Sequence, residues 1–266
     1  MVDCAAANLG STPVHRVRLL LLVPATALAV AACGSSTTTG SGAPAGTTPT
    51  GAAPAAATTS AAPEDNGVSA LSAEQILTKA KTALGAANAV HIKGTGVDDD
   101  GTVKIDMRYG PDGAVGSFIV SGQRLDLRRV GEVVYIKGDA SFWTTFANAS
   151  VAKLLGGKYV KTSLTDDDLG DLAAATDLSA SVDDFLEPDG TISKGGPTTI
   201  AGQPAIGLVS KDKTDGTLYV ATTGRPYPLS VEGGGNSVTF TGYGEALTVT
   251  APPAAEVVDQ SVLPGS

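Results

Sequence analysis

The sequence alternates apolar and polar residues without a break along Thr102-Val103-Lys104-Ile105-Asp106-Met107-Arg108-Tyr109. Successive side chains of a β-strand point to opposite faces, so the four apolar residues share one face and the four polar residues share the other. One apolar and one polar face are typical of a strand in an antiparallel sheet with a single buried side. The pattern therefore predicts a half-buried antiparallel strand.

Strands of similar length are predicted on both sides of this one. Turn-forming Asp and Gly residues separate them, which is typical of strands that follow one another through tight turns. We interpret this part of the chain as an antiparallel meander. Its five predicted strands are residues 90–97, 102–109, 114–121, 124–130 and 133–137.

A helix is predicted before the meander. Ser72 and Gln75 have the spacing of a capping box, in which each side chain accepts a hydrogen bond from the other residue's backbone N–H. Apolar residues then recur at helical spacing from Ile76 to Leu84. These features predict an amphipathic helix that Ser72 caps.

Further helices are predicted after the meander. Residues 139–155 have the pattern of a helical or irregular excursion, with Asp139 or Ser141 as a cap at its start. Two more short helices are predicted at residues 166–176 and 181–186, started by Thr165 and Ser181.

Strand patterns return in the rest of the chain. A short strand is predicted at residues 158–160, and six more follow after residue 190. The later six are residues 191–200, 203–211, 216–222, 227–232, 237–241 and 246–250. The expected fold class is α+β, with a sheet of about eleven antiparallel strands and a few helices.

The N-terminal segment has the layout of a secretory signal. Arg16 and Arg18 lie in a short basic region, an apolar run follows over residues 19–30, and small residues lead into Cys33. Val30-Ala31-Ala32-Cys33 resembles the bacterial lipobox. The resemblance implies a signal peptide over residues 1–32 and a diacylglycerol on Cys33, which would anchor the chain at the outer face of the cytoplasmic membrane.

The remaining chain divides into a tether and a folded domain. Residues 33–69 consist almost entirely of Gly, Ser, Thr, Ala and Pro, a composition that buries too little apolar surface to fold. We expect a lipidated, disordered tether here. Residues 70–262 are expected to form the domain.

Charge excludes some partners. The chain has 18 Lys and Arg against 27 Asp and Glu, a net charge of −9. Binding to nucleic acid needs a basic footprint, so the sequence predicts no such partner. The same balance argues against electrostatic docking on anionic lipid.

Catalytic and metal-binding motifs are lacking. His91 is the single histidine after the predicted signal, and its place in a strand predicts a structural role. No Gly-x-Ser-x-Gly motif and no histidine pair for zinc occur. We therefore predict no enzymatic activity, no cofactor and no metal site.

The order of several segments resembles the actinobacterial LppX/LprG-type lipoproteins, whose fold is similar to the carriers LolA and LolB. The resemblance implies a strongly curved antiparallel half-barrel wrapped around helices, and some members of the family hold acyl chains between sheet and helices. The matching segments are residues 90–94, 133–139, 142–143, 157–160, 202–205 and 218–229.

Two functional hypotheses follow. In the first, the protein binds the acyl chains of a lipid or glycolipid in an apolar cavity and carries it through the envelope. In the second, the protein is a tethered scaffold or sensor partner with a filled core. The sequence names no protein partner. The residues expected to line the cavity are Ile105, Met107, Leu125, Trp143 and Leu154.

Overall fold

The fold is α+β. A computed structural model describes residues 64–98, 101–166, 169–188, 190–211 and 216–262. These residues form one twelve-stranded sheet, in the order β12–β6–β5–β4–β3–β2–β1–β11–β10–β9–β8–β7, together with five α-helices. All strand pairs are antiparallel except β12 with β6. The strong curvature that the resemblance implies stays a prediction.

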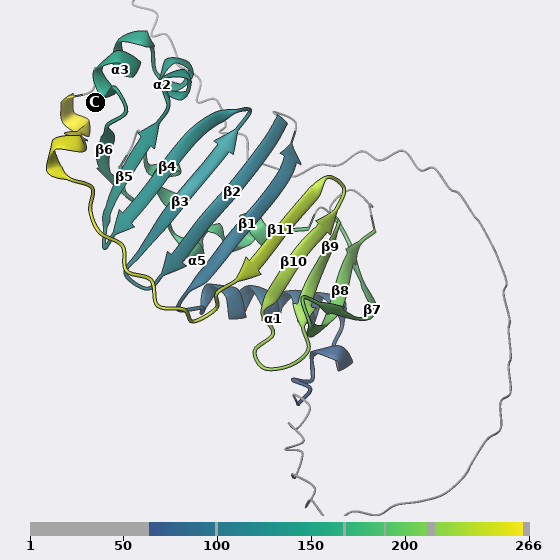
Figure 1. The fold of residues 1–266 in the computed structure, drawn as a ribbon. Coiled ribbons are helices and arrows are strands. Elements are labelled where there is room, and N and C mark those ends of the chain that lie inside the picture. The colour runs from purple at the N-terminus through teal and green to yellow at the C-terminus, as the bar shows by residue number, and fades with distance from the viewer. Residues whose placement is uncertain (1–63, 99–100, 167–168, 189, 212–215, 263–266) are drawn as a thin grey trace, which may run out of the picture.

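The predicted meander is confirmed, and it forms one half of the sheet (Figure 1). Its strands are β1 (Val90–Asp98), β2 (Gly101–Gly110), β3 (Gly113–Val120), β4 (Gln123–Val130) and β5 (Val133–Gly138). The other strands are β6 (Tyr159–Ser163), β7 (Ile192–Ile200), β8 (Gln203–Ser210), β9 (Thr217–Ala221), β10 (Pro228–Gly233), β11 (Asn236–Thr241) and β12 (Val257–Asp259).

The helices cover one face of the sheet, here called the inner face. Figure 1 looks onto the opposite, outer face, with α1 and α5 behind the sheet and with α2 and α3 beyond β5. The helices are α1 (Ala73–Gly85), α2 (Ala140–Phe146), α3 (Ala149–Leu155), α4 (Gly170–Ala174) and α5 (Leu178–Leu186). No described helix is both long and apolar enough to cross a membrane.

The alternation along β2 separates these two faces. Ile105, Met107 and Tyr109 are buried beneath the helices, whereas Lys104 and Arg108 are exposed on the outer face. Tyr109 also donates a hydrogen bond from its hydroxyl to the carbonyl oxygen of Ala175, 3.0 Å away, and so connects β2 to the segment between α4 and α5. The apolar side of the sheet is the core of the domain.

A glycine allows one close approach within this core. Gly116 on β3 pairs with Met107 on β2. A Cβ at this position would overlap the carbonyl oxygen of Asp106 and lie 2.6 Å from Met107 Sδ. The absence of a side chain at residue 116 leaves room for Met107, which is fully buried.

Two helix caps are confirmed. Ser72 Oγ accepts a hydrogen bond from Gln75 N at 3.3 Å, and Gln75 Oε1 accepts one from Ser72 N at 3.1 Å, which completes the capping box of α1. Asp139 caps α2 by accepting from the backbone N–H of Phe142 at 2.7 Å. Both α1 and α2 therefore begin at side chains that satisfy the free N–H groups of their first turns.

The predicted starts of the last two helices are wrong. Helix α4 begins at Gly170, and Thr165 does not cap it. Helix α5 begins at Leu178, because Asp177 Oδ1 accepts from the backbone N–H groups of the two residues after Leu178. Ser181 lies inside α5 and is buried.

The ends of the domain also differ from the prediction. Residues 246–250 form no strand; they cross the ends of β2 and β3, where Leu247 and Val249 lie against Gly110 and Gly113. The twelfth strand instead lies at Val257–Asp259. At the other end, Val68 is 1% exposed in an apolar cluster with α1, so the packed chain begins before residue 70.

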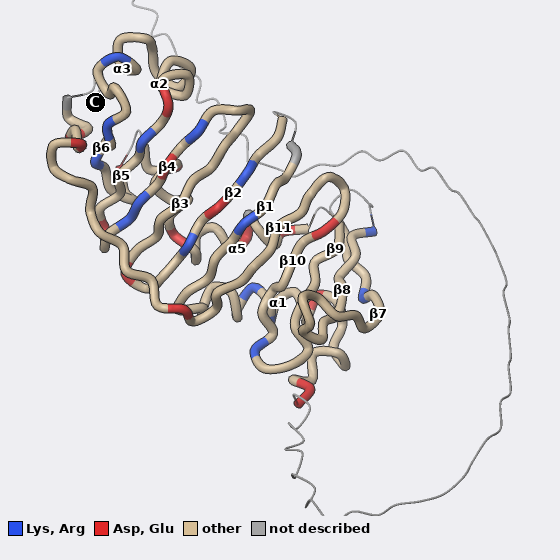
Figure 2. Tube along the Cα trace, viewed as in Figure 1, with Lys and Arg blue, Asp and Glu red and all other residues tan. Residues whose placement is uncertain are grey.

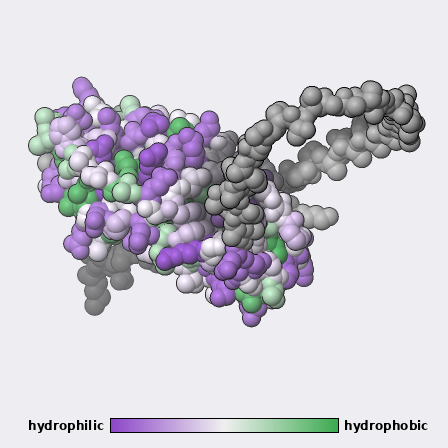
Figure 3. Space-filling model, turned by 60° about the horizontal axis from the view of Figure 1, so that its bottom comes forward, coloured by the Kyte–Doolittle hydropathy of each residue, from purple (hydrophilic) through white to green (hydrophobic). Residues whose placement is uncertain are grey.

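The surface in Figure 3 is mostly hydrophilic, with small separate hydrophobic areas.

Candidate functional site

The structure brings together four of the five residues predicted to line a cavity. Ile105 and Leu125 lie on the inner face, where each pairs with Phe118 of β3. Met107 is 0% exposed and Trp143 of α2 is 1% exposed, and all four belong to one core cluster. Leu154 does not join them, because it is 48% exposed on α3. Cys33 lies outside the described residues.

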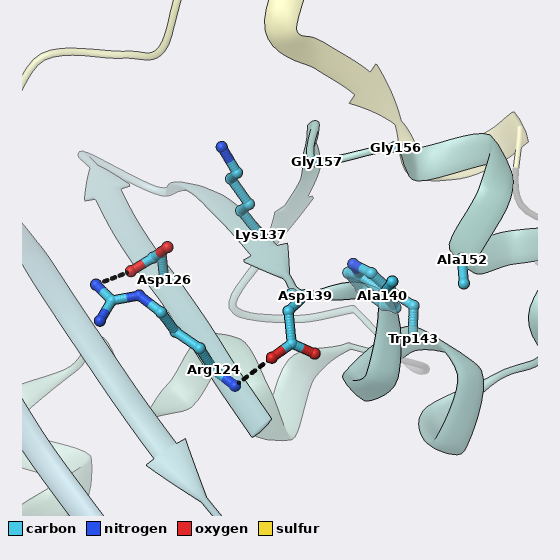
Figure 4. A pocket seen from close by; sticks show the side chains of 10 residues that line it. Arg124, Asp126, Lys137, Asp139, Ala140, Trp143, Ala152, Gly156 and Gly157 are labelled. Carbon is cyan, nitrogen blue, oxygen red and sulfur yellow. Dashed lines mark hydrogen bonds and ion pairs between the residues drawn. The ribbon is translucent and has the colours of Figure 1, made fainter. Parts of the chain in front are cut away.

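A pocket opens beside this cluster, where the ends of β4 and β5 meet α2 and α3 (Figure 4). We call it the β5–α2 pocket. Its volume is about 230 Å³. It is lined by Arg124, Asp126, Lys137, Gly138, Asp139, Ala140, Trp143, Ala152, Gly156 and Gly157.

The inner wall of the β5–α2 pocket is apolar. Gly138 pairs with Leu125, so its backbone lies at the edge of the inner face. A Cβ on Gly138 would overlap Phe142 Cδ1 and lie 2.9 Å from Trp143 Nε1. The ring of Trp143 meets that of Phe142 edge to face, with centroids 5.1 Å apart. The absent side chain at residue 138 therefore lets α2 pack its aromatic residues against the end of β5.

The indole N–H of Trp143 is buried and has no acceptor among the described residues. An unsatisfied buried donor costs about 1–3 kcal/mol, and buried polar groups in native proteins are generally paired with protein, water or a bound group. Trp143 lines the β5–α2 pocket. A ligand oxygen in this pocket is therefore a suitable acceptor for Nε1–H.

The outer rim of the pocket is charged. Arg124 Nη2 donates to Asp126 Oδ1 at 2.6 Å, and the backbone N–H of Arg124 donates to Asp139 Oδ2 at 2.8 Å (Figure 4). Lys137 Nζ lies 5.4 Å from the centroid of the Tyr159 ring, a cation–π arrangement. Two cations and two carboxylates thus surround the opening.

Hydrogen bonds favour the charged forms of Asp139 and Arg124. The backbone N–H groups of Arg124 and Phe142 hold the pKa of Asp139 below its usual value, and the hydrogen bond to Asp126 raises the pKa of Arg124. The four charges cancel, so the rim offers both donors and acceptors without a net charge. This combination suits a group rich in hydroxyls, because each hydroxyl both donates and accepts.

Sequence reasoning found only part of this site. It singled out Trp143, but not the charged rim or the pair Gly156-Gly157. Strand alternation places Arg124, Asp126 and Lys137 on one face. Strand alternation does not show that the chain turns back at the end of α3 and places Gly156 and Gly157 beside the end of β5.

His91 has a partner on the outer face. Its Nε2 lies 2.7 Å from Asp106 Oδ1 on the neighbouring strand. Among the residues that the structure describes, no group of three or more His, Cys, Asp or Glu side chains could hold a metal ion.

Comparisons with known proteins give structural likeness only. No family model and no curated protein matches the chain. The solved structure of LprF from Mycobacterium bovis is similar at 16% identity and a TM-score of 0.40, covering 68% of this chain and 96% of that one. An uncharacterized conserved protein from Thermus thermophilus is similar at 13% identity and a TM-score of 0.34, over 71% of this chain and 99% of that one.

A third similar structure is the MucA/MucB complex of Pseudomonas aeruginosa, at 16% identity and a TM-score of 0.30, covering 68% of this chain and 58% of the matched one. At these scores the three likenesses assign neither a family nor a function to the chain.

Proposed function

We propose that this protein is an envelope lipoprotein that binds an amphipathic lipid with a hydroxyl-bearing headgroup, such as a glycolipid. The observation that carries the proposal is the buried indole N–H of Trp143, which lacks an acceptor among the described residues at the point where a charged rim meets an apolar wall. In this proposal Cys33 is acylated, and the chain between Cys33 and the packed domain, predicted as residues 33–69, tethers the domain to the outer face of the cytoplasmic membrane.

The rim would hold the headgroup. Lys137 and Arg124 would donate hydrogen bonds to its oxygens, while Asp126 and Asp139 would accept from its hydroxyls. Trp143 Nε1–H would donate to the oxygen that lies deepest. The volume of about 230 Å³ falls below the roughly 300–1,000 Å³ of drug-sized ligand pockets, so it suits a headgroup and not a whole lipid.

The acyl chains would lie against apolar groups beyond Trp143. Ile105, Met107 and Leu125 belong to the same core cluster as this tryptophan, so a chain would reach them if α2 and α3 moved away from the sheet. Phe146 and Leu154 are each 48% exposed on these two helices. They would supply apolar contacts outside the core. Binding of this kind involves no chemical reaction. The protein would carry the lipid through the envelope by releasing it at a different place from the one where it was bound.

A second candidate is a tethered protein that carries nothing. Met107 and Trp143 are almost completely excluded from solvent, as in a filled core. If α2 and α3 never separate from the sheet, the domain would act through its surface, as a scaffold or as the partner of a sensor.

Fluorescence of Trp143 distinguishes the two candidates, since this is the single tryptophan of the chain. The protein, made without residues 1–33, would be titrated with a brominated alkyl maltoside, which carries a sugar headgroup and a quenching bromine on its chain. The lipid-binding proposal expects saturable quenching. A brominated fatty acid, which lacks the hydroxyls, is expected to bind more weakly.

Two variants locate the site. Lys137→Gln is expected to weaken maltoside binding about tenfold, since a charge-assisted hydrogen bond contributes about 1.5 kcal/mol or more. Lys153→Gln removes one positive charge from α3 outside the pocket lining, and should bind as the unaltered protein does. Absence of quenching by either probe, with the fold intact by circular dichroism, would favour the filled-core candidate.

A further inference from the structure

The outer face of β1 to β6 gathers positive charge. Strand register places seven cations on this face and two carboxylates, Asp106 and Asp126, among them. We call this surface the basic outer face. In Figure 2, where Lys and Arg are blue, blue segments are spread over the neighbouring strands of this half of the sheet. The cations are Lys93, Lys104, Arg108, Arg124, Arg128, Lys137 and Lys161.

The sign of this face is opposite to that of the whole chain. Seven cations against two carboxylates leave five positive charges on the face, whereas the chain has a net charge of −9. The fold therefore places an excess of positive charge on one face, although the chain as a whole is negative.

Both carboxylates are engaged within the face. Asp106 lies 2.8 Å from Lys93 Nζ and 2.7 Å from His91 Nε2, and these hydrogen bonds lower the pKa of Asp106. Asp126 is paired with Arg124. Their negative charge is thus already matched by neighbouring side chains.

Three cations remain available to a partner. Lys104, Arg108 and Lys161 are exposed, and none of them forms an ion pair with another described residue, although Asp259 of β12 lies beside Lys161 in the sheet. Arg128, by contrast, donates to the carbonyl oxygen of Thr250. The free cations lie on β2 and β6, which are separated in the sheet by β3, β4 and β5.

A hollow of about 300 Å³ lies between the free and the paired cations. Lys93, Lys104 and Arg124 line it together with Asp106, the carboxylate that is paired with Lys93, while Thr95 and Ser117 contribute only short side chains. Long side chains around short ones leave space for one anionic group in contact with several cations. A phosphate of a lipid headgroup has this charge and size.

We propose that the basic outer face docks on the anionic phospholipid surface of the membrane, with a headgroup phosphate in the hollow. Charge complementarity selects this occupant: each Lys or Arg near an anionic leaflet strengthens binding by about fivefold, so the five net charges add up over an extended surface. Arg124 lines both the hollow and the β5–α2 pocket. Docking would therefore bring the opening of that pocket to the membrane, but it does not depend on lipid binding there.

Vesicle sedimentation tests the docking. The chain without residues 1–33, which has no acyl anchor, is mixed with vesicles of phosphatidylglycerol and phosphatidylcholine or of phosphatidylcholine alone. We expect binding to the anionic vesicles only, with loss in 1 M salt, where the screening length falls to about 3 Å. A triple variant with Lys104, Arg108 and Lys161 changed to Gln should bind about 100-fold more weakly.

A matched variant removes the same charge elsewhere. Lys79, Lys153 and Lys211 lie away from the basic outer face and are exposed, so changing these three to Gln is expected to leave most of the binding. Equal binding to both kinds of vesicle, or equal loss in the two triple variants, would overturn the proposal. Binding to a soluble anionic polysaccharide but not to anionic vesicles would also overturn it and assign the face to a glycan. The maltoside should still quench Trp143 in the triple variant of Lys104, Arg108 and Lys161. A failure of membrane docking is thereby distinguished from a failure of lipid binding in the pocket.

Discussion

Asp139 connects three parts of the candidate site, and its replacement tests how firmly α2 is held. One carboxylate oxygen accepts from Phe142 N and Ser141 Oγ, each at 2.7 Å, and the other accepts from Arg124 N at 2.8 Å. Loss of an N-cap costs about 1 kcal/mol. Loss of the bond to Arg124 costs about 1 kcal/mol more at this half-exposed position. We expect Asp139→Ala to lower the free energy of unfolding by about 2 kcal/mol.

Urea unfolding measures this loss. With a slope near 2 kcal/mol per M, the midpoint of Asp139→Ala should fall by about 1 M at unchanged slope. In Asp139→Asn the amide oxygen can still accept from the backbone N–H of Phe142 and cap α2. The amide nitrogen cannot accept from the backbone N–H of Arg124, so the midpoint should fall about half as far. An unchanged midpoint in the alanine variant would refute the view that this carboxylate fixes α2 to β4.

The pH dependence supplies a second check on the same residue. Because the folded pKa of Asp139 is lowered below 3.8, the ionised form stabilises the folded state above that pH. This contribution is lost as the pH falls through the lower, folded pKa. The difference in stability between the unaltered protein and Asp139→Asn should therefore be constant near neutral pH and shrink below about pH 4.

Three further substitutions test the packing by urea unfolding. Tyr109→Phe should lower stability by about 1–2 kcal/mol, because the carbonyl of Ala175 loses its buried donor; no change would contradict this. Ser72→Ala should cost about 1 kcal/mol through loss of the capping box, whereas Ser69→Ala, outside the box, should be neutral. Gly138→Ala should cost about 1–3 kcal/mol by overpacking and should also abolish maltoside quenching; retained quenching would argue against the pocket.

Local patterns predicted the meander well and the end of the chain poorly. Alternation along residues 102–109 has a period of two, so it indicates both the strand and its buried face. Residues 246–250 contain Thr and Val typical of strands, but they lie across strand ends and not along an edge. Whether such a segment pairs with a strand edge depends on where elements distant in the sequence lie. A local sequence pattern carries no information about their positions. The prediction of Ser181 as a helix cap was wrong for a similar reason, since Asp177 is also of a residue type that accepts from free N–H groups.

Net charge says little about any single face of the sheet. Its value of −9 argues against docking on anionic lipid, whereas the docking proposal rests on the cations that the fold collects on one face. Lys104, Asp106 and Arg108 already alternate with apolar residues in the sequence, so summing charges by strand face would have indicated this. The β5–α2 pocket could not have been found in that way, because Arg124 and Gly156 meet only through the return of α3.

The most direct test of lipid binding is native mass spectrometry of the chain without residues 1–33, purified from a bacterial host with abundant glycolipid. Such a chain lacks Cys33, so any lipid mass must be held without a covalent bond. We expect a population heavier by the mass of one lipid, which Lys137→Gln reduces and Lys153→Gln does not. A single bare mass in all three proteins, together with absent quenching of Trp143, would contradict the proposal that this domain binds lipid.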